Sequence, residues 1–378
     1  MDFKRYLVLG TGVGQAVAYA LLKNSVLNIV TLADMDYERT LNIREKFCRT
    51  INEDRICIPM RFVAGQTDAA SLFKGFDVVI SALPAKYNLE LAEAAIIAHT
   101  NFCDLGGVVE ITRETLQLSN KYHNMESSIV PDCGLMPGLG IIIAKKLMQD
   151  LGGAESIEIM VGGLPQKPRP PTFYQKVFHP EGLRHICYDP APIVSGGEIK
   201  WVQPFSDYSQ IEVPELKNFS EKFNGRVETF VTAGASVAAW SFMKWGVNNF
   251  AEKTVRWPGF VDFFKNVSPD QFEKMVATHV NIPVDSENPD LVWMRVTTSG
   301  GKNGFSGHKS VSLLELFDPE TGLTAMQRTT GFTTAIIAEM IAEGKTKTGV
   351  NTPENAFDHP GLNEILDRVG SFLTLKEN

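Results

Sequence analysis

The sequence has few residues of the kinds that build disulfide frameworks, metal centres or membrane spans. Its five cysteines are an odd number, lie far apart and include no C-x-x-C pair, which disfavours a disulfide framework and a structural zinc site. Its seven histidines show no metal-ligand spacing, so we expect no metal. No apolar run approaches the roughly 20 residues that a bilayer span needs. These absences predict a cytoplasmic protein without a membrane partner.

The chain also has fewer basic than acidic residues. The chain has 36 Lys and Arg against 44 Asp and Glu, a net charge of −8, which argues against nucleic acid or an anionic membrane as a partner. An apolar run already begins at Tyr6, so we expect no signal peptide. With 378 residues, of which 44% are hydrophobic, the chain is long enough for two globular domains.

The first 36 residues have the order strand, glycine turn, helix, strand, acid. The apolar run Tyr6–Leu9 leads into the turn Gly10-Thr11-Gly12-Val13-Gly14, and an Ala-rich helical stretch follows. A second apolar run, Ile29–Leu32, ends at Asp34. This order is typical of a dinucleotide-binding βαβ unit, and we predict that these five turn residues and Asp34 bind the cofactor.

Each residue of this unit has a physical role. Gly10 permits the tight turn, and Gly12, which has no Cβ, lets the backbone approach a pyrophosphate at the positive end of the helix. The Asp34 carboxylate can accept hydrogen bonds from the adenosine ribose, and it would repel a 2′-phosphate. The predicted cofactor is therefore NAD rather than NADP.

The glycine spacing departs from the usual G-x-G-x-x-G, because Gly14 comes one residue early and Gln15 stands in the expected place. Either the turn is one residue shorter or Gly14 serves a different local need. The alternative to cofactor binding is an ordinary glycine-rich turn in an α/β protein.

The alternation of strands and helices continues after residue 36. Arg61–Val63, 77–82, 101–105 and 129–131 are predicted strands, which with the intervening helices favour an α/β, Rossmann-like, doubly wound parallel sheet. Later segments favour a second, α+β domain with helical pieces near 235–250 and 259–278. We place the first domain at 1–134, completed by 325–378, and the second at 135–324.

Ligands of doubly wound sheets bind beyond the carboxyl ends of the strands. The residues at those ends are therefore further candidates for cofactor binding: Ala82, Leu83, Pro84, Asp104, Leu105 and Gly106. Asp132 follows the next strand and is a candidate for the chemistry itself.

Seven segments carry a resemblance to a known family. They are the glycine turn with Ala33-Asp34, Val78–Pro84, Cys103–Gly107, Pro131–Gly138, Val161–Pro165, Glu252–Gly259 and Met326–Phe332. Together they make nearly the whole chain similar to the saccharopine dehydrogenase family, and most similar to its lysine 6-dehydrogenase branch. The resemblance implies an NAD(P)-linked enzyme that oxidises the C–N bond of an amino acid, and a second domain that binds substrate and forms a homodimer.

Two departures from the family pattern lie in the presumed substrate domain. Relatives often have R-Y-P-G-H where this chain has Arg256-Trp257-Pro258-Gly259-Phe260, and often have Ser or Trp where this chain has His179. Both concern the identity of the substrate more than the type of reaction.

An ammonium group must lose a proton before hydride can leave the neighbouring carbon, so the enzyme needs a base. Asp132 is a candidate; alternatively it caps the following helix or binds local backbone. Tyr174 is a second catalytic candidate, whose alternative is a packed edge residue. Candidate substrate-binding residues are Arg256 and Arg328, which suit a carboxylate, and also His179 and Lys253.

The alternatives for these side chains are ordinary surface roles. Exposed arginines commonly pair with nearby acids, and Lys253 could pair with acidic neighbours on a helix face.

Three functions remain open from the sequence. The first is oxidative deamination of the lysine ε-amine to the semialdehyde, which cyclises to a piperideine carboxylate. The second is a saccharopine-type dehydrogenase or reductase of a secondary amine, whose pocket needs two carboxylate clamps. The third is an NAD-binding protein without turnover.

Overall fold

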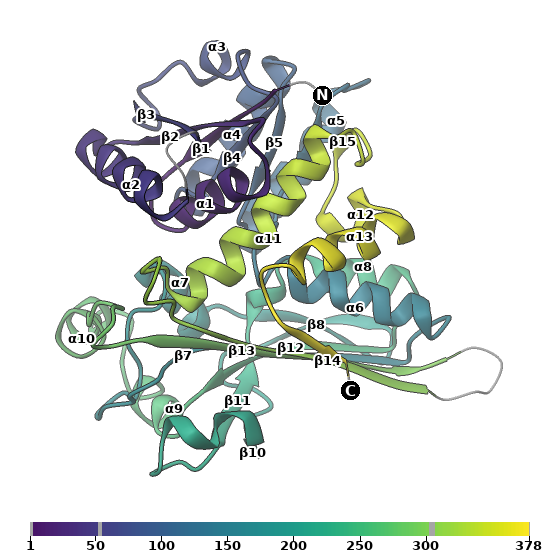
Figure 1. Ribbon diagram of the computed structural model, residues 1–378. Helices are drawn as coiled ribbons and strands as arrows, with labels where there is room; N and C mark the ends of the chain where they lie inside the picture. Colours follow the sequence, from purple (N-terminus) through teal and green to yellow (C-terminus); the bar gives the residue numbers. More distant parts are fainter. Residues whose placement is uncertain (1–2, 52–54, 302–306, 378) are drawn as a thin grey trace. The chain divides into compact units, whose positions relative to one another are not determined.

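The structure is a computed structural model that describes residues 3–51, 55–301 and 307–377. The chain divides into two compact units (Figure 1). The first unit contains residues 1–142 and 327–372, and the second contains 143–326 and 373–378. The last residues were predicted to belong to the first domain. They lie in the second unit because strand β16 (Leu375–Glu377) pairs with β14 of that unit.

The first unit is built on a seven-stranded sheet in the order β15-β6-β5-β4-β1-β2-β3, and all its neighbouring strands are parallel. The predicted doubly wound sheet is thus confirmed. The strands are β1 (Lys4–Leu9), β2 (Asn28–Asp34), β3 (Ile56–Arg61), β4 (Val78–Ser81), β5 (Asn101–Asp104), β6 (Ser128–Val130) and β15 (Gly349–Val350).

The third strand was predicted at 61–63, and this placement is wrong. The strand β3 runs from Ile56 to Arg61 at the edge of the sheet. Its apolar residues Ile56 and Ile58 are exposed, and Pro59 stands within it, which an edge strand tolerates because one of its sides needs no hydrogen-bond donors. Because its apolar residues are exposed and Pro59 interrupts them, β3 does not form the continuous apolar run by which a buried strand is recognised in a sequence.

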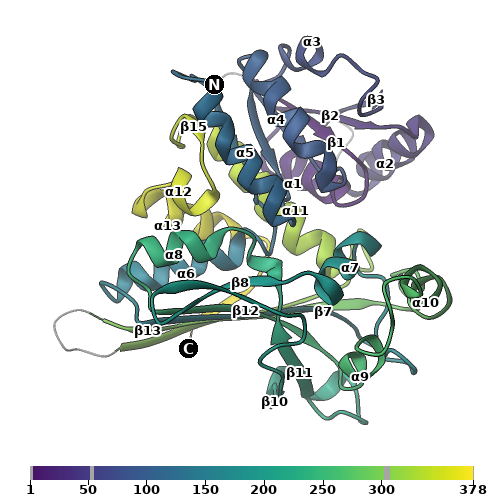
Figure 2. The same ribbon diagram turned by 180° about the vertical axis from the view of Figure 1, so that it is seen from behind.

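Helices cover both faces of this sheet. Figure 1 shows α1, α2 and α11 in front of it, and Figure 2, seen from behind, brings α4 and α5 to the front. Buried parallel strands need such cover, because both of their faces are apolar. The helices of the first unit are α1 (Gly14–Asn24), α2 (Tyr37–Thr50), α3 (Ala69–Phe73), α4 (Asn88–Ile97), α5 (Val109–Lys121), α12 (Pro353–Ala356) and α13 (His359–Val369).

The helix α11 (Ala325–Ala342) returns from near the C-terminus to pack against α1 within the first unit. A Cβ added to Gly331 would lie 2.6 Å from the Cβ of Ala16, so the two helices touch backbone to backbone there. One residue further on, the Phe332 ring stacks on Tyr19 with the centroids 6.2 Å apart. Thr334 donates a hydrogen bond to the carbonyl of Cys133 at 2.9 Å. These contacts tie the C-terminal region into the N-terminal sheet.

The second unit contains a mixed sheet with the path β10-β11-β12-β7-β13-β14-β16, and β8 and β9 attach beside β12. Within the described residues, β7 and β12 form the parallel pair, and the other pairs are antiparallel. The strands are β7 (Ser156–Pro165), β8 (Ala191–Ser195), β9 (Glu198–Val202), β10 (Ser209–Glu212), β11 (Arg226–Val231), β12 (Asn249–Arg256), β13 (Asp290–Gly300) and β14 (Gly307–Leu316).

The helices of this unit differ from those expected. The piece predicted near 235–250 shrinks to α8 (Ala238–Lys244), because β12 begins at Asn249. The piece predicted near 259–278 is divided into α9 (Phe260–Phe264) and α10 (Phe272–His279) by a segment that contains Pro269. The other helix within this unit is α7 (Pro180–Tyr188), while α6 (Leu139–Asp150) begins in the first unit and continues into the second.

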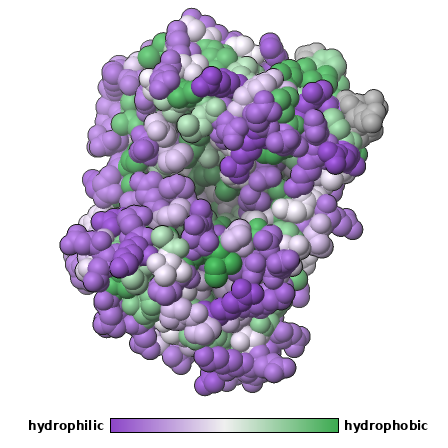
Figure 3. All heavy atoms as spheres, turned by 90° about the vertical axis from the view of Figure 1, so that its left-hand side faces the viewer, coloured by the Kyte–Doolittle hydropathy of each residue, from purple (hydrophilic) through white to green (hydrophobic). Residues whose placement is uncertain are grey.

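The described helices include none with the length and apolar character that crossing a lipid bilayer requires. On the face drawn in Figure 3, hydrophilic residues predominate, and hydrophobic ones are interspersed among them.

Gly331→Ala should destabilise the protein although alanine favours helices. The propensity gain is about 1 kcal/mol, and the cost of overpacking against Ala16 is about 1–3 kcal/mol. Urea unfolding should show a net loss. Ala16→Gly removes the nearest of the close contacts but leaves the backbone nitrogen of Val17 at 2.9 Å, so a double-mutant cycle should give a favourable coupling energy that recovers part of the loss. A more stable single variant would contradict the close contact.

Candidate functional site

The glycine turn joins β1 to α1 at the carboxyl edge of the sheet. Gly10 has a φ of 91°, and a Cβ there would lie 2.7 Å from the carbonyl oxygen of Ala82. A Cβ at Gly12 would meet no atom within 4 Å, so the backbone of Gly12 faces open space. A Cβ at Gly14 would lie 3.0 Å from Val8 Cγ1, so Gly14 permits the close packing of α1 on β1. The early third glycine therefore serves helix–strand packing.

Asp34 closes this turn from the end of β2. Its Oδ2 accepts hydrogen bonds from the backbone N–H of Thr11 at 2.8 Å and from the Thr11 hydroxyl at 2.6 Å. Its Oδ1 accepts a bond from the N–H of Asp36 at 3.1 Å. Burial raises the pKa of Asp34, but these hydrogen bonds outweigh burial and hold the pKa below its usual value. A negative charge is therefore fixed beside the turn at neutral pH.

The turn also receives a side chain from α11. Gln327 donates a hydrogen bond from Nε2 to the carbonyl of Gly12 at 3.0 Å, and Gln15 donates to the same oxygen at 3.2 Å. The sequence analysis did not select Gln327. Its only signal there was its place in the segment Met326–Phe332.

The residues predicted at the ends of β4 and β5 line up along the same edge. The N–H of Ala82 donates to the carbonyl of Leu9 at 2.8 Å, which places the 82–84 segment beside the glycine turn. Asp104 is buried, and its Oδ1 accepts bonds from the N–H groups of Gly106 at 2.7 Å and Asp132 at 3.1 Å. Burial raises the pKa of Asp104 to about 6. Through these two bonds Asp104 holds the backbone at Gly106 and Asp132 in place at the carboxyl edge of the sheet.

Asp132 follows β6 with a left-handed φ of 67°, which is uncommon for a residue with a side chain. Its side chain is buried, and its Oδ1 accepts a hydrogen bond from the hydroxyl of Thr112 on α5 at 2.9 Å. A Cβ added to Gly106 would lie 1.9 Å from this Oδ1. The carboxylate is thus held firmly at the carboxyl edge, and its role as a base stays a prediction.

Arg328 also lies in the first unit, on α11, with its guanidinium 5.1 Å from the centroid of the Phe332 ring. The other predicted residues, Tyr174, His179, Lys253 and Arg256, lie in the second unit. The first unit thus contains Asp132 and Arg328 together with all the predicted cofactor-binding residues. The second unit contains the remaining candidates.

Arg256 is almost fully buried at the end of β12. Its Nη1 donates to the carbonyl of Val255 at 2.7 Å, and its guanidinium lies 4.9 Å from the Tyr174 ring centroid and 5.3 Å from that of Phe260. Its Nε has no hydrogen-bond partner, and no acidic group of the described residues forms an ion pair with it. Burial lowers the pKa of Arg256 and raises that of Tyr174. A buried guanidinium with spare donors is costly, and an anionic group would satisfy it.

Two buried acids that the sequence analysis did not select lie near Arg256. Glu252, also on β12, accepts hydrogen bonds at Oε2 from the Thr232 hydroxyl at 2.6 Å and from the N–H of Gly234 at 3.1 Å. Burial raises its pKa to about 8. Glu228 accepts a bond from the N–H of Val261 at 2.6 Å, and burial raises its pKa as well. The sequence signal for Glu252 was its place in the segment Glu252–Gly259.

Lys253 lies on the strand β12, so the expectation of a helix face is wrong. Its Nζ forms ion pairs with Asp207 at 2.7 Å and Glu158 at 3.0 Å. Burial lowers the pKa of Lys253, but these partners outweigh burial and raise it. His179 is exposed at the start of α7, where its Nδ1 accepts a hydrogen bond from the N–H of Glu181 at 3.3 Å and caps the helix.

Comparison with known protein families gives two matches that together span most of the chain. Residues 6–130 match the saccharopine dehydrogenase NADP binding domain, and residues 134–372 match the saccharopine dehydrogenase C-terminal domain.

Individual proteins are also similar to the chain. Alpha-aminoadipic semialdehyde synthase of Arabidopsis thaliana is 28% identical over 166 residues, which are 41% of this chain and 15% of that much longer protein. The apo structure of saccharopine dehydrogenase (L-Glu forming) from Saccharomyces cerevisiae has a TM-score of 0.73 at 15% identity, and the match covers 99% of this chain and all of the yeast chain. The yeast structure shows that the fold is shared.

The buried Glu252 predicts a pH dependence of stability. Above its usual pKa of 4.5 the unfolded chain loses a proton that the folded protein keeps up to about pH 8. The free energy of unfolding should therefore fall with rising pH in this interval, by up to about 1.4 kcal/mol per pH unit from this group. Glu252→Gln should flatten the fall in urea titrations, and the exposed control Glu221→Gln should leave it unchanged. Equal slopes in all three proteins would contradict a protonated Glu252.

Proposed function

The chain belongs to the saccharopine dehydrogenase family, and on that premise we propose that it is a nicotinamide-dependent oxidoreductase of amino-acid metabolism acting on a C–N bond. The observation that carries the proposal is the glycine turn of residues 10–14, with an open face at Gly12 and an ionised Asp34 beside it. This turn lies within the matched nucleotide-binding domain.

The residues of the turn fit a dinucleotide. The open face at Gly12 leaves room for a pyrophosphate, and the first N–H groups of α1 offer donors to it. Asp34 accepts three hydrogen bonds within the chain and keeps one lone pair, on Oδ1, for a ribose hydroxyl. We propose NAD as the cofactor, because the Asp34 charge would repel a 2′-phosphate. The bound nicotinamide would accept the hydride.

The substrate that we propose is lysine, oxidised at its ε-amine to the semialdehyde. A free lysine amine has a pKa near 10.4, so it must lose a proton before its lone pair can form the C=N bond. Asp132 is the proposed base, because it is held rigidly at the sheet edge where such ligands bind. Arg256 is proposed to bind the α-carboxylate, since its guanidinium has donors without acceptors.

A saccharopine-type reaction on a secondary amine is the second candidate. Saccharopine carries two amino-acid moieties and needs two carboxylate clamps, and Arg328 is the other arginine besides Arg256 among the predicted substrate-binding residues. The name of the similar yeast protein favours the same candidate, whereas the name of the plant protein, a semialdehyde synthase, is compatible with both.

A panel assay distinguishes these candidates. The purified chain is incubated with NAD or NADP and with lysine, ornithine, saccharopine or alanine, and the reduced nicotinamide is followed by its absorbance. Turnover of lysine supports the first candidate, and turnover of saccharopine alone supports the second. Calorimetric binding of NAD without turnover of any amine would overturn the enzymatic proposal.

Arg256→Lys should raise KM for the amino-acid substrate by about tenfold or more, because the planar fork that holds a carboxylate is lost while the charge is kept. The KM for NAD should not change. Arg328→Lys, measured in parallel, should raise KM for saccharopine only if the second clamp operates. An unchanged amino-acid KM in Arg256→Lys would remove Arg256 from substrate binding.

Asp34→Ser should raise the ratio of kcat/KM with NADP to that with NAD by about tenfold or more, since the repelling charge is removed. Glu38→Gln, which removes an exposed charge from the first turn of α2, is the matched control. Arg39 lies close enough to act electrostatically on Asp34, so Arg39→Ala is a third arm. If Arg39→Ala alone changes the use of NADP, the preference for NAD is refuted.

A further inference from the structure

A cavity lies in the first unit, away from the glycine turn. Its volume is about 670 Å³, which is within the range of small-molecule sites. It lies where β1 begins, beside the turn between α1 and β2 and the last turns of α11 and α13. Tyr6 lines this cavity four residues before Gly10 on β1, which at the rise of a strand is roughly 13 Å. The cavity is therefore distinct from the cofactor edge.

The charges around this cavity are only partly balanced by the protein. Arg368 forms bonds of 2.9 and 2.7 Å with the two oxygens of Glu343, and of 2.6 Å with Glu364. Lys345 pairs with the same two acids at 2.7 Å each. These four side chains neutralise one another, which leaves Glu339 as a buried acid outside the network.

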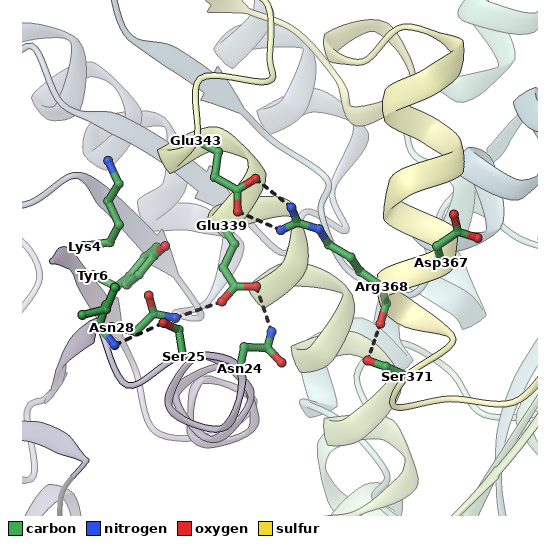
Figure 4. Close-up of a pocket in the computed structure, with 11 residues that line it drawn as sticks. Lys4, Tyr6, Asn24, Ser25, Asn28, Glu339, Glu343, Asp367, Arg368 and Ser371 are labelled. Carbon is green, nitrogen blue, oxygen red and sulfur yellow. Dashed lines mark hydrogen bonds and ion pairs between the residues drawn. The ribbon is translucent and has the colours of Figure 1, made fainter. Parts of the chain in front are cut away.

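Glu339 is 7% exposed and has no basic partner among the described ion pairs. Its Oε2 accepts a hydrogen bond from Asn24 at 2.8 Å, and its Oε1 accepts one from Asn28 at 2.9 Å. Figure 4 shows this carboxylate held between the two amides at the wall of the cavity. The two amides donate hydrogen bonds to the Glu339 carboxylate but bring no positive charge to balance it. Burial raises the pKa of Glu339.

Tyr6 supplies an independent sign of a ligand. The side chain is 1% exposed, and its hydroxyl has no hydrogen-bond partner among the described residues. Figure 4 shows the hydroxyl end of the ring turned toward the side of the cavity where Glu339 and Glu343 lie. The hydroxyl oxygen is not among the fully buried polar atoms that lack a partner, so it borders the cavity and can accept a partner from there. The natural partner of a hydroxyl beside carboxylates is a group with several N–H donors.

A metal ion does not fit this site. No three His, Cys, Asp or Glu side chains of residues 3–51, 55–301 and 307–377 gather as ligands for one. The volume of the cavity also exceeds what a bare ion fills. We propose that the cavity is a second binding site, for a small organic molecule with a primary ammonium group, which donates to the Glu339 carboxylate and to the oxygen of Tyr6.

The site is joined to the cofactor turn by one helix. Glu339 lies twelve residues after Gln327 on α11, roughly 18 Å along the helix axis. Gln327 holds the carbonyl of Gly12, so one helix contacts both the cavity and the predicted cofactor turn.

Isothermal titration of the full chain with n-pentylammonium, in the absence of nucleotide, tests the proposal. Tyr6→Phe and Glu339→Gln should each weaken binding by about tenfold or more, because the first removes an acceptor for the ammonium group and the second removes the negative charge that it pairs with. Glu114→Gln removes the same charge from the exposed face of α5 and should leave the affinity within about twofold. Pentan-1-ol, which has the same chain without the charge, should not bind.

Two results would overturn the proposal: absence of binding to the unmodified chain at millimolar probe, or equal affinities in the unmodified chain, Tyr6→Phe and Glu339→Gln. The second result would mean that the amine binds elsewhere, at the cofactor edge for example. Tyr6→Phe also keeps the test independent of folding. The Tyr6 hydroxyl bonds to no described residue of the chain. The thermal midpoint of Tyr6→Phe should therefore not fall below that of the unmodified chain.

Discussion

The backbone contact between α1 and α11 is the constraint on which the first unit depends. Only a glycine at 331 leaves room for Ala16 at that distance, and the contact fixes a helix from near the C-terminus to the first helix of the chain. The rest of α11 is positioned by it. One end brings Gln327 to the carbonyl of Gly12, and the other brings Glu339 to the turn that precedes β2. A single packed helix therefore shapes both the cofactor turn and the cavity.

The second unit buries ionisable side chains, whose charged forms are costly there. Glu252 and Arg256 lie four residues apart on β12, both almost fully buried, and neither has an ion-pair partner in the part of the chain that the structure describes. Glu252 is supported by Thr232 and by backbone, whereas the Nε of Arg256 is left without an acceptor. Perturbed and under-satisfied charges of this kind concentrate at functional sites, which is why Arg256 supports the proposed binding of a carboxylate. In the family to which the chain belongs, amino-acid substrates carry that group.

Local patterns were sufficient for the core of the first unit. The strand, the glycine turn, the helix and the strand that ends at Asp34 are present as predicted, because buried apolar runs and glycines act through neighbouring residues. The same reasoning misplaced the edge strand β3, whose apolar residues are exposed. It also put Lys253 on a helix, because the strand β12 is stabilised by β7, nearly 100 residues away, and not by its own periodicity. The site residues selected for their motifs remain predictions.

The sequence by itself determined the family, the parallel sheet and the class of cofactor, since these follow from short segments whose chemistry is local. The tertiary structure alone decided that Gln327 holds the glycine turn, that Arg256 is buried without an ion-pair partner among the described residues, and that Tyr6 and Glu339 face one cavity. The reason is chain separation. Tyr6 and Glu339 are more than 300 residues apart, and no periodicity or motif records which side chains meet when a distant helix returns to the first strand.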